Sequence, residues 1–161
     1  MLVLLFLMVA PFQPPASSPQ APNPIVIENR KPAAADWEIS DPALEREIEG
    51  FAGSTSVNRG DAIELFVSTR DPRDTIDVFR MGWYGGSGAR RVAGPLEQPG
   101  IAQEVPPPDP ATGLIECRWR NPVRVVTKND DGVWTSGVYL ARLTALPSRQ
   151  AVVHRVRRAR R

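Results

Sequence analysis

The sequence RMGWYGG at residues 80–86 holds the side chains best suited to contact another molecule. Its glycines let the backbone bend and approach another surface closely. Trp83 and Tyr84 combine apolar area with a polar atom, so they are suited to stack on a sugar ring or on a partner's aromatic side chain. The competing hypothesis is a tight turn in which Trp83 closes one end of the fold, because tryptophan is mostly buried in proteins. The candidate binding residues in this loop are Arg80, Trp83, Tyr84, Gly85 and Gly86.

A phosphate site is not indicated at this loop, because no Lys-Ser or Lys-Thr pair follows the glycines and no helix is predicted to begin there. Arg59 is a further candidate contact, presented by the sequence NRGD at residues 58–61. Asparagine, glycine and aspartate are also the residues that form tight turns. The simpler interpretation of residues 58–61 is therefore a hairpin turn.

Metal-binding and nucleophilic residues give weak signals. Asp71, Asp74 and Asp77 lie close in sequence and could offer oxygen atoms to Ca²⁺, but they lack the spacing of a calcium loop. Cys117 is the single cysteine, which excludes an intrachain disulfide and a cysteine-based metal site, and it is predicted to be a small buried residue. A nucleophilic Cys117 would need the single histidine, His154, which lies among arginines. The sequence predicts no catalytic residue and no metal ligand.

Alternating apolar and polar residues between residues 48 and 88 predict the three strands around which the chain is organised. A repeat of two residues marks a strand with one buried face. Residues 62–69 and 75–81 follow this pattern, although Phe79 comes directly after Val78. Turn-forming sequences, NRGD and DPRD, separate the strands. The inward side chains are predicted to be Ile63, Leu65, Val67, Ile76, Val78 and Met81.

The rest of the chain predicts more short strands and no long helix. In residues 114–120 the alternation places Ile115, Cys117 and Trp119 on the core face. Gly94-Pro95 is expected to end a strand, and the prolines of residues 106–110 cannot donate ladder hydrogen bonds. About nine short strands favour an all-β fold, an antiparallel β-sandwich of the Ig-like or jelly-roll type. The predicted strands are 25–27, 37–39, 90–93, 114–120, 124–127, 133–143 and 150–156, with one helical turn at 41–46.

The length of 161 residues fits one domain with tails. Residues 1–10 resemble the hydrophobic part of a secretory signal, although a positive residue near the start is missing. Residues 11–24 are a proline-rich linker, and residues 25–156 form the sandwich module. Residues 157–161 are a basic tail, expected to be solvated. The net charge is +2 and arginines cluster at the end, so the rest of the chain is net negative.

Five blocks of the sequence are NPIVIENRKP, STSVNRGDAIELFVST, TIDVFRMGWYGGSGAR, PDPATGLIECRW and WTSGVYLARLT. These blocks resemble the amino-terminal part of the large (beta) subunit of N,N-dimethylformamidase and its relatives. They occur in order between residues 23 and 144, and the motif RMGWYGG is the most specific of them. The resemblance implies a β-sandwich that precedes a larger α/β domain similar to glutamine-amidotransferase-like folds. That domain would hold a mononuclear iron through tyrosine and glutamate ligands and hydrolyse the amide.

The resemblance does not extend to the iron ligands, so we expect no cofactor in this chain and a product truncated before the catalytic domain. The leading hypothesis is a non-catalytic, exported module, secreted or located in the periplasm or cell envelope, that packs against a catalytic α/β domain or subunit. One alternative is a carbohydrate-binding module that uses Trp83 and Tyr84. Another is an accessory part of an amidohydrolase assembly with a separate catalytic chain. We expect neither a specific nucleic-acid partner nor a transmembrane span.

Overall fold

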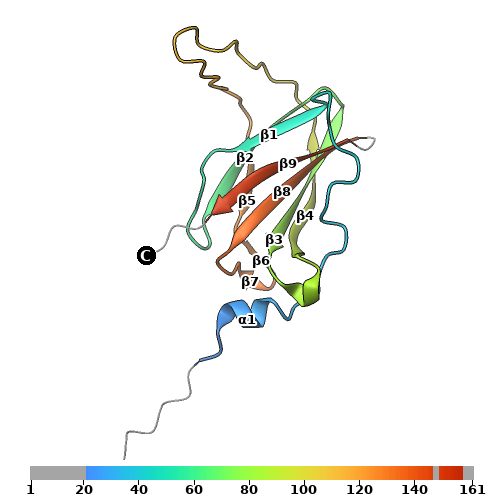
Figure 1. The fold of residues 1–161 in the computed structure, drawn as a ribbon, viewed down its shortest axis with the longest axis vertical. Coiled ribbons are helices and arrows are strands. Elements are labelled where there is room, and N and C mark those ends of the chain that lie inside the picture. Colours follow the sequence, from blue (N-terminus) through green and yellow to red (C-terminus); the bar gives the residue numbers. More distant parts are fainter. Residues whose placement is uncertain (1–20, 147–148, 158–161) are drawn as a thin grey trace, which may run out of the picture.

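The computed structural model describes residues 21–146 and 149–157, and the side chains of these residues other than 154–157. Two antiparallel sheets pack face to face (Figure 1). One contains β1 (Ile48–Ala52), β2 (Ala62–Thr69) and β5 (Val123–Val126), in the order β1-β2-β5. The other contains β3 (Arg73–Met81), β4 (Ala89–Pro99), β8 (Val138–Ala145) and β9 (Gln150–Arg157), in the order β4-β3-β8-β9. The predicted antiparallel β-sandwich is confirmed.

Three short elements complete the fold. Helix α1 (Pro24–Glu28) precedes the sheets, and the 3₁₀ turn η1 (Tyr84–Gly86) joins β3 to β4. The strands β6 (Lys128–Asn129) and β7 (Gly132–Val133) form a small hairpin, as the turn sequence at residues 129–132 indicates. No helix among the described residues is long and apolar enough to cross a membrane. The signal-like residues 1–10 lie outside the described part of the chain.

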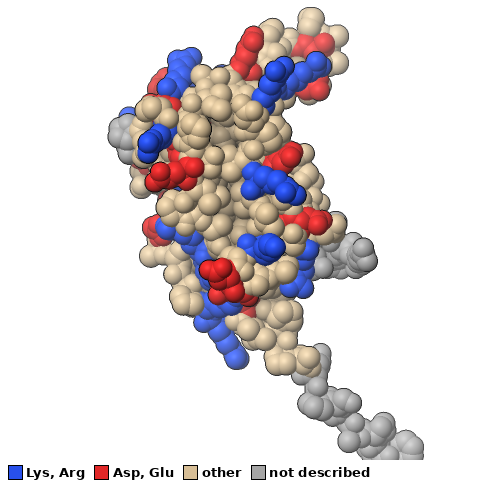
Figure 2. Space-filling model, turned by 180° about the vertical axis from the view of Figure 1, so that it is seen from behind, with Lys and Arg blue, Asp and Glu red and all other residues tan. Residues whose placement is uncertain are grey.

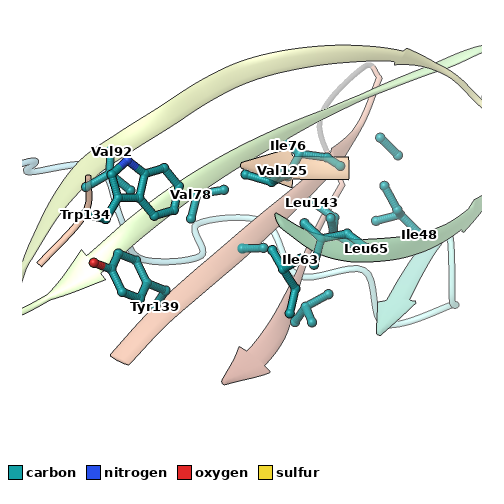
Figure 3. Close-up of a cluster of buried hydrophobic side chains, with 13 residues drawn as sticks. Ile48, Ile63, Leu65, Ile76, Val78, Val92, Val125, Trp134, Tyr139 and Leu143 are labelled. Carbon is teal, nitrogen blue, oxygen red and sulfur yellow. The ribbon is translucent and has the colours of Figure 1, made fainter. Parts of the chain in front are cut away.

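The core lies between the two sheets, where the inward side chains of both meet (Figure 3). Leu65 from β2 and Ile76 and Leu143 from β3 and β8 are almost fully removed from solvent. Burying one such side chain stabilises the fold by about 1.5–3 kcal/mol. Trp134 and Tyr139 stack at one end of this core, with ring centroids 5.2 Å apart. The predicted inward positions in β2 and β3 therefore form the core, except that Val67 and Met81 are only partly buried.

Strand β3 is buried on both faces, whereas the sequence pattern predicts one buried face. Asp77 and Phe79 are both buried, although they alternate with the core residues Ile76 and Val78. Their face is covered by arginine side chains and by the chain near Asp36, whose backbone carbonyl accepts a hydrogen bond from Arg142 Nη1. The Phe79 ring lies 5.0 Å from the Arg142 guanidinium carbon and 5.6 Å from that of Arg91. The apolar residue that interrupts the alternation thus serves a second, smaller packing layer.

Three predictions before β1 are wrong. Residues 25–27 are helical, because Asn23 accepts a hydrogen bond from the Ile25 amide and Pro24 occupies the first helical turn. Residues 37–39 form no strand, and residues 41–46 form no helical turn. Instead, the Ala43 amide donates to the Gln150 carbonyl at 2.8 Å, which draws this segment along the start of β9. Helix α1 begins at residue 24, which the sequence pattern assigned to the linker.

The predicted stop at Gly94-Pro95 is also wrong, because β4 continues through it to Pro99. Gly94 has φ of +103°, and the pairing with β3 shifts register beside Asp77. A Cβ atom on Gly94 would lie 2.5 Å from the carbonyl oxygen of Ile76. The glycine therefore allows a β-bulge that bends the strand without ending it.

Residues 114–120 are not a strand, contrary to the sequence pattern. They form one leg of an extended loop, residues 102–121, which projects from the sandwich and is called the arm below (Figure 1). Trp119 packs on Phe51 with ring centroids 5.1 Å apart, but Ile115 is 48% exposed and Cys117 is half-buried. The opposite leg carries prolines at residues 106–108, which have no N–H to pair with a strand. The predicted strand therefore lacks a partner inside the described chain.

Asp74 makes the stability of the fold depend on pH. Its carboxylate is buried in β3, its Oδ1 atom has no partner among the described residues, and burial raises its pKa to about 6. Because the folded pKa lies above the unfolded one, the stabilisation present below about pH 4 is lost as pH rises through about 6. We expect Asp74→Asn to raise the free energy of unfolding by about 1–3 kcal/mol at pH 8 and to change it little at pH 4. Urea unfolding at both pH values measures this, and equal effects at the two values would contradict it.

Candidate functional site

Most of the candidate binding residues lie at one end of the sandwich, where α1, η1 and the β6–β7 hairpin meet (Figure 1). This end, residues 23–31, 82–88 and 128–134, is called the α1–η1 end below. The loop after β3 turns through Gly85 and Gly86, which have φ of +68° and +97°. These angles favour glycine, and a Cβ atom on Gly85 would meet nothing within 4 Å. The two glycines therefore shape the turn and leave its surface open.

Arg80 and Tyr84 are buried inside this end, each about 3% exposed. Arg80 Nη1 donates to the Tyr84 hydroxyl at 2.9 Å, and Arg80 Nη2 donates to the Ser136 carbonyl at 3.1 Å. The Tyr84 hydroxyl donates in turn to Glu28 Oε1 at 3.1 Å. Burial raises the pKa of Tyr84. Tyr84 cannot offer its ring to a ligand, so the predicted two-ring surface of Trp83 and Tyr84 does not exist.

Glu28 joins helix α1 to the sandwich through a cluster of charges. Arg90 Nε lies 2.9 Å from Glu28 Oε1, and Lys31 Nζ lies 3.1 Å from Glu28 Oε2. Asp131 bridges the same two cations, at 3.2 Å from Arg90 Nη2 and 3.4 Å from Lys31 Nζ. Burial raises the pKa of Glu28, but hydrogen bonds from Arg90 and Lys31 outweigh it and hold the pKa below its usual value. Glu28 therefore stays ionised and fixes α1 against β4 and the β6–β7 turn.

Trp83 is 70% exposed and does not close the end of the sandwich, contrary to the alternative prediction. Its backbone amide donates to Asn29 Oδ1 at 3.2 Å, which places it beside the end of helix α1. The helix exposes Ile25, Val26 and Ile27, each 47–49% accessible, while Glu28 faces inward. We call Ile25, Val26, Ile27 and Trp83 the end patch. Its helix is held against the sandwich by Glu28 and Arg90, the two least exposed charges of the cluster.

Arg59 lies in the predicted hairpin turn, where the Asp61 amide donates to the Asn58 carbonyl at 3.2 Å. Its guanidinium donates to the Trp134 carbonyl at 3.2 Å and so holds the chain after β7. Arg59 also lines a small apolar cavity of about 40 Å³ between the sheets, together with Ile63. The cavity has room for a few water molecules. Arg59 thus ties the turn at residues 58–61 to the chain after β7.

Metal binding finds no support in the geometry. The described residues contain no group of three or more His, Cys, Asp or Glu side chains able to hold an ion. Tyrosine and glutamate are the iron ligands that the resemblance implies for the catalytic domain, and here Tyr84 and Glu28 lie in hydrogen-bond contact. However, Arg80, Arg90 and Lys31 bind these same two groups, and their positive charges oppose a cation. These residues do not fit the iron site.

Sequence reasoning missed Glu28, Arg90 and Asp131, because nothing in the pattern links positions so far apart. The Asn23-Pro24 pair was the available signal, since an asparagine cap followed by proline marks a helix start. A helix at this position would have placed Glu28 in its last turn. The charges on the surface are interspersed, as Figure 2 shows for the face seen from behind. No large area of one sign is visible on that face.

Comparison with known proteins identifies the family. The family model described as N,N-dimethylformamidase beta subunit-like, C-terminal, matches residues 75–161, just over half of the chain. The resemblance in the sequence pointed to the same subunit, although it placed the chain in the amino-terminal part. No curated protein and no solved structure matches the chain. The chain belongs to the N,N-dimethylformamidase beta subunit-like family.

Proposed function

We propose that the chain is a non-catalytic β-sandwich module of a formamidase-type amidohydrolase assembly, and that its α1–η1 end docks on the catalytic α/β domain or subunit. The observation that carries this proposal is the end patch. Four large apolar side chains are exposed on neighbouring elements, and one of them, Trp83, is 70% accessible. Exposed apolar side chains that gather at one end of a domain favour an interaction site there.

The base beneath the patch supports the same role. Glu28, Arg90, Lys31 and Asp131 hold helix α1 in position before any partner arrives. Such preorganisation reduces the conformational entropy lost on binding. Tryptophan is also one of the residue types enriched among those that dominate protein interfaces. The module would then contribute shape and contacts to the assembly while the chemistry takes place in the partner.

The docking proposal is tested with a separately produced catalytic α/β domain of a formamidase-type large subunit. Calorimetric titration into this chain should give saturable binding, which Trp83→Ser or Ile27→Ser weakens at least tenfold. Leu114→Ser is the matched control, because Leu114 is an equally apolar side chain, 63% exposed, on the arm. Equal affinities for all three variants and the unchanged chain would contradict the proposal.

Carbohydrate binding is the second candidate, and the exposure of Trp83 favours it. A single accessible indole ring can stack on a sugar, although Tyr84 cannot contribute because it is buried. Titration with soluble polysaccharides should then shift the tryptophan emission, and Trp83→Phe should reduce that shift. The absence of any shift with cellulose, xylan and mannan oligosaccharides would exclude this candidate for those glycans.

We also propose that the module works outside the cytoplasm. The apolar run in residues 1–10 and the proline-rich residues 11–24 support export. A fusion of residues 1–30 to a periplasmic reporter enzyme should be exported and cleaved. Retention of the uncleaved fusion in the cytoplasm would contradict this part of the proposal.

A further inference from the structure

The arm contains a strand-forming sequence whose backbone is unpaired. Among the described residues, the peptide groups of 115–119 make no hydrogen bond, while the ends of the arm are well held. At the tip, the Asp109 amide donates to the Leu114 carbonyl at 2.8 Å. At the base, the Gln103 side chain exchanges two hydrogen bonds of 2.8 Å with the backbone of Arg120. The backbone donors and acceptors of residues 115–119 are therefore unpaired within the described chain.

The arm alone cannot supply hydrogen-bond partners for the backbone of residues 115–119. The two contacts above, and the hydrogen bond from Trp119 Nε1 to the Glu104 carbonyl, align residues 104–109 with residues 114–119. This alignment places the prolines of 106–108 opposite residues 115–117, and prolines donate no hydrogen bond. The other edge of residues 114–120 has no strand beside it in the described chain. Among the described residues no strand can complete the pairing, whereas a strand of a second molecule would do so.

The sequence of the segment is complementary to itself. We propose that residues 114–120 of two copies of this chain pair as antiparallel strands about a two-fold axis through Cys117. In that register Glu116 of one copy lies opposite Arg118 of the other, and the two-fold axis gives two such pairs in the dimer. Ile115 lies opposite Trp119, which is a favourable cross-strand combination of a β-branched and an aromatic residue. The pairing uses the same surface on both copies, so it closes as a dimer.

The exposed charges are in place for this contact. Glu116 and Arg118 side chains are 69% and 85% exposed and lie 3.6 Å apart within one chain, so both can turn to a partner at little cost. Figure 2 shows charges of both signs on the arm at the top of the view. The seven-residue segment has an ordinary length for a strand. The contact lies at the opposite end of the sandwich from α1 (Figure 1), so it is independent of the docking function proposed above.

Cys117 reports directly on this geometry, because it lies on the proposed axis and is the only cysteine. Directly opposed residues of antiparallel strands have Cα atoms about 4.5–5.5 Å apart, within the range of a disulfide. Oxidation of the full chain with copper phenanthroline should therefore give a disulfide-linked dimer in high yield. The control is Ile115→Cys in a Cys117→Ser background, since the two copies of position 115 would lie roughly 13 Å apart. A dimer from the control at the same rate as from Cys117, or none from Cys117, would overturn the proposal.

Exchanging the charges of positions 116 and 118 distinguishes this pairing from any other association of the chain. Sedimentation equilibrium should show a reversible dimer, and Glu116→Arg or Arg118→Glu alone should weaken it about tenfold by placing like charges opposite each other. The double variant Glu116→Arg/Arg118→Glu restores opposite charges and should recover the dimer. Thermal unfolding should be the same for all four chains, because both side chains are exposed. A monomer at every concentration, or singles and double that dimerise equally, would overturn the proposal.

Discussion

We expect Asp77→Ala to lower the free energy of unfolding by about 3 kcal/mol, because it leaves the buried Arg142 guanidinium with only the exposed carboxylate of Asp36, 3.6 Å away. Asp77 Oδ2 accepts a hydrogen bond from Arg142 Nη2 at 2.8 Å, and the two residues are 5% and 8% exposed. Arg91 Nε lies 3.5 Å from the other carboxylate oxygen. Urea unfolding followed by tryptophan fluorescence measures the loss as a lower midpoint with an unchanged slope.

The matched control for Asp77 is Glu97→Ala, which removes a carboxylate from strand β4 of the same sheet. Glu97 lies 3.8 Å from Arg73, and the two side chains are 72% and 68% exposed. Solvent screens such a pair, so its removal should change the free energy of unfolding by about 0.5 kcal/mol or less. Equal, small effects of both substitutions would show that the outer face of β3 is not a buried layer.

The second large effect is expected from Glu28→Ala at the α1–η1 end. Removing this carboxylate leaves Arg90 and Lys31 with Asp131 alone, and Tyr84 loses its acceptor. Breaking a buried charge cluster in this way costs about 3 kcal/mol or more. Because α1 lies at the edge of the fold, we expect local opening of this end while the sandwich stays folded. Hydrogen exchange at the amides of residues 29–31 and 86–88 should become about a hundredfold faster.

Glu38→Ala is the control for this substitution, since Glu38 belongs to the same segment before β1 and is exposed. It should leave the exchange rates at residues 29–31 unchanged. If Glu28→Ala also left them unchanged, the buried charges would not be what holds helix α1. Docking on the catalytic domain should fall in parallel with the faster exchange.

Most strands of the sandwich were predictable from their alternation, including β5, which pairs with the distant β2, whereas the arm was not. Apolar and polar side chains alternate with a period of two in residues 62–69, and this pattern was sufficient to predict β2. Residues 114–120 carry the same alternation, but the prolines opposite them cannot form a ladder. Gly94-Pro95 was predicted to end a strand, but a β-bulge at Gly94 allows β4 to continue past it. The apolar-polar alternation alone indicates that a segment can form a strand. Pairing also requires a neighbouring strand with free backbone N–H groups.

The sequence indicated the loop that lies at the α1–η1 end, but it did not predict which of its side chains are buried. Trp83 and Tyr84 are adjacent in sequence, yet Trp83 is exposed and Tyr84 is buried. The Tyr84 hydroxyl forms hydrogen bonds with Arg80 and Glu28 inside the fold. Adjacent side chains around a tight turn point in different directions, and sequence does not say which one turns inward. Glu28 was overlooked because residues 25–27 were predicted to be a strand. The site could be recognised only in the structure, where α1 lies beside the loop that follows β3.

The most direct test of the central claim is hydrogen exchange of this chain with and without the catalytic α/β domain of a formamidase-type large subunit. The account predicts slower exchange at residues 24–31 and 82–88 in the complex, with the opposite end of the sandwich unchanged. Slower exchange confined to other surfaces, or no change at any residue at saturating concentrations, would contradict docking through the α1–η1 end.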